Sequence, residues 1–225
     1  MSEWFLSRVE LNVALRGAQK LLRSPEAMHA AVLSCFPRSA AEDLGRVLWR
    51  TDSFNGSSYV LIQSSRRPDL SVIEKQAGWL GAESSGIKGL DSLLDSLHEG
   101  QVLRFMLRAN PVRSVMPEGE SLGKRGKVIA HVTVEHQLDW LTSRADKLGV
   151  AFQADGLGTV QVAERGTYRF RKAGAGRPVR LAFADFRGAL SVSDTAAFRR
   201  SILNGVGRGK AYGLGMWALA PVGRV

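Results

Sequence analysis

The same order of strands and helices is expected twice along the chain, and this repetition constrains the fold more than any other feature. In the first half, residues 3–13 alternate between apolar and polar side chains, as a half-buried strand does. Ser24-Pro25-Glu26 predicts a helix start, because serine is a favourable N-cap and proline a favourable first helical residue. Strands are predicted at residues 46–51 and 58–64, and the Asn55-Gly56 dipeptide between them is typical of a hairpin turn.

The second half begins with a strand just after Gln101. In the segment VLRFMLRA, Leu103, Phe105 and Leu107 face one way, whereas the two arginines face the other way with Met106. A helix is expected over residues 134–148. Another is expected to start at Asp194, its N-cap, and to end at Gly205. Further strands are expected near residues 159–163, 167–172, 179–192 and 212–220.

Each half therefore runs from a strand through a helix to a pair of strands, an order typical of a βαββαβ ferredoxin-like unit. A chain of 225 residues has room for two domains of about 100 residues each. The predicted fold is α+β, with two tandem ferredoxin-like (RRM-like) domains over residues 1–96 and 97–225.

The chain carries a formal net charge of +10. Such a surplus attracts polyanions, of which nucleic acids are the commonest in a cell, although ribosomal and membrane-surface proteins share it. Cys35 is the only cysteine, so no intramolecular disulfide can form and a reducing cytoplasm is expected. No run of ~18 apolar residues is present that would span a membrane. The histidine spacings fit no common zinc pattern, and we expect neither a metal nor a cofactor.

The glycine-rich segment GVGRGKAYGLG, residues 205–215, is the strongest local signal. Glycines allow backbone N–H groups to approach a phosphate, and the two cations between them complete an anion site. A P-loop is excluded because only three residues separate Gly205 from the Gly-Lys pair, where a P-loop has four, and Ala211 follows the pair in place of serine or threonine. The other interpretation is a flexible helix-to-strand turn. The residues expected to contact RNA here are Gly207, Arg208, Gly209 and Lys210.

A basic hairpin is expected over residues 165–180, which contain six basic residues and no acid. A cationic hairpin can enter a nucleic-acid groove and meet phosphates on both sides, and in A-form RNA such contacts read mainly shape. The alternative is a solvated hairpin whose charges only aid solubility. The hairpin residues assigned to RNA are Arg165, Arg169, Arg171, Lys172 and Arg177.

His29 lies in the second turn of the helix that starts at Ser24, just off its apolar stripe. Histidine can exchange a proton near neutral pH, and RNA carries its own nucleophile, the 2′-hydroxyl. RNA cleavage therefore needs only a group that transfers a proton and nearby cations that stabilise the phosphorane, and no metal is required. The alternative is a partly buried structural histidine. Tyr212 and Trp217 can stack on bases or pack in the core.

Three segments together resemble the CasE family, the repeat-processing endoribonucleases of type I-E CRISPR Cascade complexes. The first is residues 25–29 (PEAMH), in a helix that ends at Phe36-Pro37, and the second is residues 104–111 (RFMLRANP). The third is the glycine-rich segment together with residues 219–221 (LAP) at the end of the last strand. They follow the family's order and span nearly the whole chain. The first two are specific to CasE, whereas the glycine loop occurs in a wider group of CRISPR repeat nucleases.

The resemblance implies cleavage at the 3′ base of the repeat stem-loop, giving a 2′,3′-cyclic phosphate and a 5′-hydroxyl. It implies His29 as the catalytic residue, insertion of the basic hairpin into the RNA major groove, and a protein that is monomeric outside the complex and stays on the RNA with other Cascade subunits. Relatives often have a tyrosine where this chain has Glu26, and a carboxylate there would favour an imidazolium acting as general acid. Further cations expected at the RNA are Arg23, Arg104, Arg108, Arg113, Lys124 and Arg125.

Two other functions stay open from the sequence. A non-catalytic RNA hairpin-binding subunit of the same fold would explain Glu26 in place of tyrosine. A generic basic scaffold or ribosome-associated protein would bind any RNA with a similar salt dependence, whereas a hairpin reader prefers its cognate stem.

Overall fold

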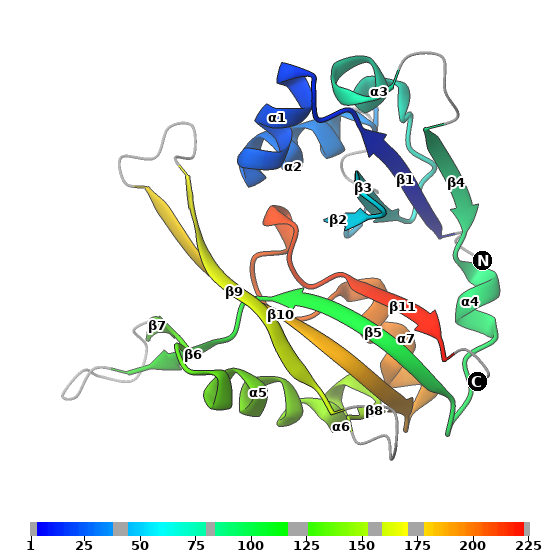
Figure 1. Ribbon diagram of the computed structural model, residues 1–225. Coiled ribbons are helices and arrows are strands. Elements are labelled where there is room, and N and C mark those ends of the chain that lie inside the picture. The colour runs from blue at the N-terminus through cyan, green and yellow to red at the C-terminus, as the bar shows by residue number, and fades with distance from the viewer. Residues whose placement is uncertain are drawn as a thin grey trace.

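Two antiparallel sheets form the body of the protein in a computed structural model, which describes residues 4–37, 45–79, 84–116, 126–152, 159–170 and 178–222. Figure 1 shows the first sheet with helices α1 to α3 beside it, above the second sheet with helices α5 and α7. The predicted α+β class with tandem ferredoxin-like units is confirmed by the strand order of both sheets.

The first sheet has the strand order β2-β3-β1-β4, which is the order of a ferredoxin-like sheet. Its strands are β1 (Phe5–Leu11), β2 (Leu48–Phe54), β3 (Ser57–Ser64) and β4 (Ser85–Gly89). Its helices are α1 (Arg16–Arg23), α2 (Pro25–Ser34) and α3 (Ser71–Ala77). The predicted hairpin turn is confirmed, since Asn55 and Gly56 both have positive φ angles, 50° and 79°.

Helix α2 begins where the sequence predicts. The Ser24 Oγ accepts a hydrogen bond from the Ala27 N–H at 3.2 Å, and Pro25 is the first helical residue. Helix α1 was not predicted, because its residues are mostly polar. It is held by the burial of Ala18 and Leu21.

The second sheet has the order β11-β5-β10-β8, and β9 also pairs with β10. Its strands are β5 (Val102–Ala109), β8 (Val150–Ala151), β9 (Gln161–Phe170), β10 (Val179–Val192) and β11 (Trp217–Pro221). The helices are α5 (Val134–Thr142), α6 (Ala145–Leu148) and α7 (Thr195–Asn204). A separate pair is formed by β6 (Val112–Val115) and β7 (Lys127–Ala130).

Three predicted boundaries in this half were wrong. The helix expected over residues 134–148 is interrupted at Ser143 and Arg144. The strands expected near 159–163 and 167–172 are one strand, β9, as far as residue 170, with a register shift opposite Asp185 and Phe186. The last strand begins at Trp217, because residues 210–212 form a short 3-10 helix, η2 (Lys210–Tyr212).

Each sheet buries its own hydrophobic core. Val9, Met28 and Ile62 lie in the first core, and Phe105, Phe186 and Trp217 lie in the second. Helix α4 (Asp91–Asp95) lies between the sheets in sequence, and its Leu94 packs into the second core. The division into domains 1–96 and 97–225 stays a prediction.

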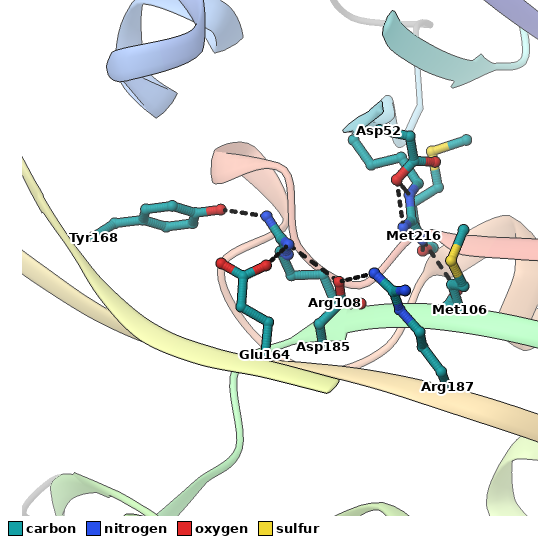
Figure 2. A network of polar contacts seen from close by, with 9 residues as sticks. Asp52, Met106, Arg108, Glu164, Tyr168, Asp185, Arg187 and Met216 are labelled. Carbon is teal, nitrogen blue, oxygen red and sulfur yellow. Dashed lines mark hydrogen bonds and ion pairs between the residues drawn. The ribbon is translucent and has the colours of Figure 1, made fainter. Parts of the chain in front are cut away.

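Two buried polar side chains join the two halves of the chain. Arg50 Nη1 donates to the carbonyls of Met106 at 3.0 Å and Met216 at 3.2 Å, while its Nε and Nη2 bind Asp52 (Figure 2). Gln63 Nε2 donates to the carbonyl of Ile202 at 2.9 Å. Each side chain therefore extends from the first sheet to backbone groups of the second half. In the described ranges, no helix is long and apolar enough to cross a membrane.

Candidate functional site

The fold brings His29 and the glycine-rich segment together, although they are far apart in sequence. His29 is half-buried on helix α2, beside the fully buried Met28. Its ring centroid lies 6.5 Å from that of Tyr212 in η2, with an interplanar angle of 61°. A histidine from the first half thus borders the loop that the sequence predicts to bind phosphate.

The glycine-rich segment has a defined conformation that its glycines make possible. Gly205, Gly207, Gly209, Gly213 and Gly215 all have positive φ angles, between 69° and 86°. The backbone also closes on itself and on the sheet: Val206 N–H donates to Gly215 O at 2.8 Å, and Gly215 N–H donates to Arg108 O at 2.7 Å. The segment is therefore attached to strand β5 at its far end and is not a free turn.

The two cations of this segment have different surroundings. Arg208 is exposed, whereas Lys210 is half-buried. Burial, and then the positive charge of Arg46, lower the pKa of the Lys210 ammonium below its ordinary value. Arg46 was not predicted as a site residue, and it adds positive charge beside the loop. The region around η2 therefore suits an anion.

Arg108 lies in a row of charged residues that crosses three strands. In the sheet register, Asp185 of β10 stands opposite Arg108 of β5 on one side and Glu164 of β9 on the other. Arg108 Nη2 lies 3.1 Å from Asp185 Oδ2 and 2.6 Å from Glu164 Oε2 (Figure 2). The buried Asp185 also lies 3.6 Å from Arg187, and it joins the two guanidinium groups.

Two aromatic side chains complete the surroundings of Arg108. Its Nη1 donates to the Tyr168 hydroxyl at 3.3 Å, and its guanidinium lies 4.9 Å from the centre of the Phe183 ring. Burial lowers the pKa of Arg108, but Tyr168, Asp185 and Glu164 together raise it above its ordinary value. The guanidinium is therefore a permanent cation held in one orientation.

A small pocket connects Arg108 with the aromatic residues near His29. It lies between the end of helix α1, the start of α2, strands β2, β5 and β9, and η2. Its lining residues are Leu21, Leu22, Pro25, Trp49, Arg50, Thr51, Arg108, Tyr168, Tyr212 and Gly213. Sequence reasoning missed Tyr168, Asp185 and Glu164. The one available signal was Asp185, an acid inside the apolar segment LAFADF.

The remaining predicted cations are distributed more widely. Arg169 is exposed on β9, the strand that contacts α2, and Arg23 is exposed at the end of α1. Arg165 is exposed but donates to the Val132 carbonyl at 2.8 Å. Arg104 borders a different groove with Arg187, and Arg113 lies on β6. The predicted residues Lys124, Arg125, Arg171, Lys172 and Arg177 lie outside the described residues.

The other histidines lie elsewhere. The rings of His131 and His136 are 5.9 Å apart, and burial followed by the charge of His136 lowers the pKa of His131. Within the parts of the chain that the structure describes, no three histidine, cysteine or acidic side chains gather as a metal site would require.

Comparison with known proteins identifies the family of this chain. The model of the "CRISPR associated protein" family matches residues 4–221. A curated relative from Thermus thermophilus, "CRISPR-associated endoribonuclease Cse3", is 30% identical over 224 residues, 96% of this chain and 100% of the relative. The chain belongs to the Cse3/CasE family of CRISPR associated proteins. The expected membership is thereby confirmed.

A further relative and a solved structure agree with membership of the Cse3/CasE family. The Escherichia coli "CRISPR system Cascade subunit CasE" is 28% identical over 130 residues, 56% of this chain and 61% of that protein. A solved structure of Thermus thermophilus Cse3 "bound to an RNA representing a pre-cleavage complex" matches with a TM-score of 0.79 and 30% identity. The match covers 97% of this chain and 100% of the other. The similarity to the Thermus thermophilus structure therefore includes both halves of the fold.

Proposed function

We propose that this protein is a metal-independent endoribonuclease that cleaves CRISPR precursor RNA at the 3′ base of the repeat stem-loop. The observation that supports this most is the contact between His29 and the glycine-rich segment. It joins a group able to transfer a proton with a loop suited to hold a phosphate. The relative named as an endoribonuclease and the Cse3 structure with bound RNA support the same activity.

In the proposed reaction, the 2′-hydroxyl oxygen upstream of the cut attacks the adjacent phosphorus. The bond from phosphorus to the 5′-oxygen breaks, the 2′-hydroxyl proton passes to a base, and the leaving 5′-oxygen gains a proton. The products are a 2′,3′-cyclic phosphate and a 5′-hydroxyl. His29 is the residue we assign to proton transfer, as the acid toward the leaving oxygen. The cations of the loop stabilise the charge on the phosphorane.

The RNA stem is assigned to the hairpin of strands β9 and β10, which rises beside helices α1 and α2 (Figure 1). Arg169 is exposed on β9, where it is available to backbone phosphates. Arg165 is also exposed, although its Nη1 donates to the Val132 carbonyl. Because one relative is named as a Cascade subunit, we place the protein with other type I-E Cascade subunits, bound to its product. Because its substrate is a transcript, it is expected to act in the cytoplasm.

The proposed activity is tested by incubating the purified protein with repeat RNA in the presence of a chelator. The expected result is one cut at the 3′ base of the stem, with a 2′,3′-cyclic phosphate on the upstream product. A repeat with a single 2′-deoxy nucleotide at the cut is expected to bind but to stay intact, because the nucleophile is missing. Binding without cleavage of the all-ribose repeat would instead indicate a non-catalytic hairpin-binding subunit.

A further inference from the structure

The side chain of Tyr212 lies between the proposed catalytic histidine and the RNA-binding hairpin. Its ring centroid is 6.5 Å from that of His29 on one side and 4.6 Å from that of Phe170 on the other. Phe170 is the buried last residue of strand β9. Helix α2, the 3-10 helix η2 and the hairpin therefore meet through two consecutive contacts among three rings.

The backbone around Tyr212 limits where this ring can lie. Gly209 and Gly213 flank η2 with φ angles of 79° and 78°, and Tyr212 N–H donates to Gly209 O at 2.8 Å. A Cβ on Gly213 would lie 2.6 Å from the Trp49 ring, so this close approach requires glycine. The phenol ring is consequently carried on a tight turn that packs against the first sheet.

We propose that Tyr212 is a positioning residue for His29, and that its ring, not its hydroxyl, performs this role. The ring limits rotation of the imidazole. Its second contact, with Phe170, fixes the position of the imidazole relative to the hairpin that holds the RNA. Proton transfer is sensitive to small displacements of the reacting groups. This inference rests on the proposed catalytic role of His29.

The test compares Tyr212→Leu, which removes the ring, with Tyr212→Phe, which removes only the hydroxyl. Single-turnover cleavage is measured at saturating protein, and affinity is measured with the 2′-deoxy repeat. We expect the leucine variant to cleave about 10- to 100-fold more slowly, with affinity close to wild type. The phenylalanine variant is expected to cleave at nearly the wild-type rate.

An NMR measurement keeps this test independent of activity. Aromatic ring currents shift the imidazole proton signals of His29, so those signals are expected to move in Tyr212→Leu and to stay nearly unchanged in Tyr212→Phe. If Tyr212→Leu does not fold, Phe170→Leu takes its place in the test. It removes the ring behind Tyr212 and is expected to slow cleavage. Wild-type cleavage by folded Tyr212→Leu, or equal loss in Tyr212→Phe, would overturn the inference. Failure of the proposed function would instead appear as no cleavage by the wild type, and failure of the catalytic role of His29 as full cleavage by His29→Ala.

Discussion

The guanidinium of Arg108 lies 3.1 Å from the buried carboxylate of Asp185, which stands directly opposite it in the neighbouring strand (Figure 2). Arg108 is one of the cations that the sequence assigns to RNA, and the sheet holds it beside the small pocket near η2. It is also paired with Glu164, whose side chain is 56% exposed. We infer that an RNA phosphate can replace this exposed carboxylate beside Arg108.

We predict that Glu164→Gln binds repeat RNA more tightly than wild type, by about 2- to 5-fold at low salt, because an exposed ion pair contributes little stability and its acid repels phosphate. Affinity for the 2′-deoxy repeat, measured over a salt series, checks this. Glu99→Gln is the matched control, since Glu99 is exposed in the turn between helix α4 and strand β5. Weaker binding by Glu164→Gln would show that this acid assists the RNA site.

Asp185→Asn is predicted to destabilise the fold by about 2 kcal/mol, because the buried side chain loses its charge-assisted contacts with Arg108 and Arg187. Urea unfolding of the two proteins measures this difference. RNA affinity is also expected to fall, since Arg108 loses the partner that orients it. Unchanged stability together with unchanged affinity would contradict the proposed role of Asp185.

Arg50→Met is predicted to lower the free energy of unfolding by about 3 kcal/mol, because it leaves Asp52 without its cation and removes the Arg50 hydrogen bonds to two carbonyls of the second half. Thermal and urea unfolding provide the measurement. Arg8→Met is a suitable control, since the Arg8 guanidinium lies over the Tyr59 ring on an exposed surface of the first sheet. Equal stability of the two variants would show that Arg50 does not join the halves.

The Cys35 thiol is predicted to react slowly with iodoacetamide in the folded protein. Burial, followed by the charge of Asp69, raises the pKa of this thiol from 9.0 to about 12. The unfolded chain therefore loses the proton more readily than the folded one. The thiol thus favours unfolding as the pH rises above about 9, and it does not affect stability below that value. Mass spectrometry with and without denaturant measures the alkylation, and rapid modification of the native protein would contradict the buried position.

The sequence predicted the elements whose pattern is local. The N-caps at Ser24 and Asp194 and the Asn55-Gly56 turn were found because cap and turn chemistry depends on neighbouring residues. Helix α1 was missed because its few buried residues are hidden among polar ones. Trp217 lies in the core, whereas Tyr212 lies half-buried beside His29.

The row formed by Arg108, Asp185 and Glu164 was not predictable from the sequence, because it depends on the register of three strands. The contact between His29 and Tyr212 was not predictable either, because it depends on how the two halves pack together. The residue types of Arg108, His29 and Tyr212 could be read from the sequence, but the side chains that contact them could not. The assignment of each cation to RNA stays a prediction.

The catalytic role of His29 is tested most directly by comparing His29→Ala with wild type in single-turnover cleavage of repeat RNA. His98→Ala is the matched control, because His98 is an exposed histidine near helix α4. Removing a general acid is predicted to slow cleavage by at least about 100-fold, with little change in affinity for the repeat, while the control cleaves normally. Cleavage by His29→Ala at the wild-type rate would contradict the proposed mechanism.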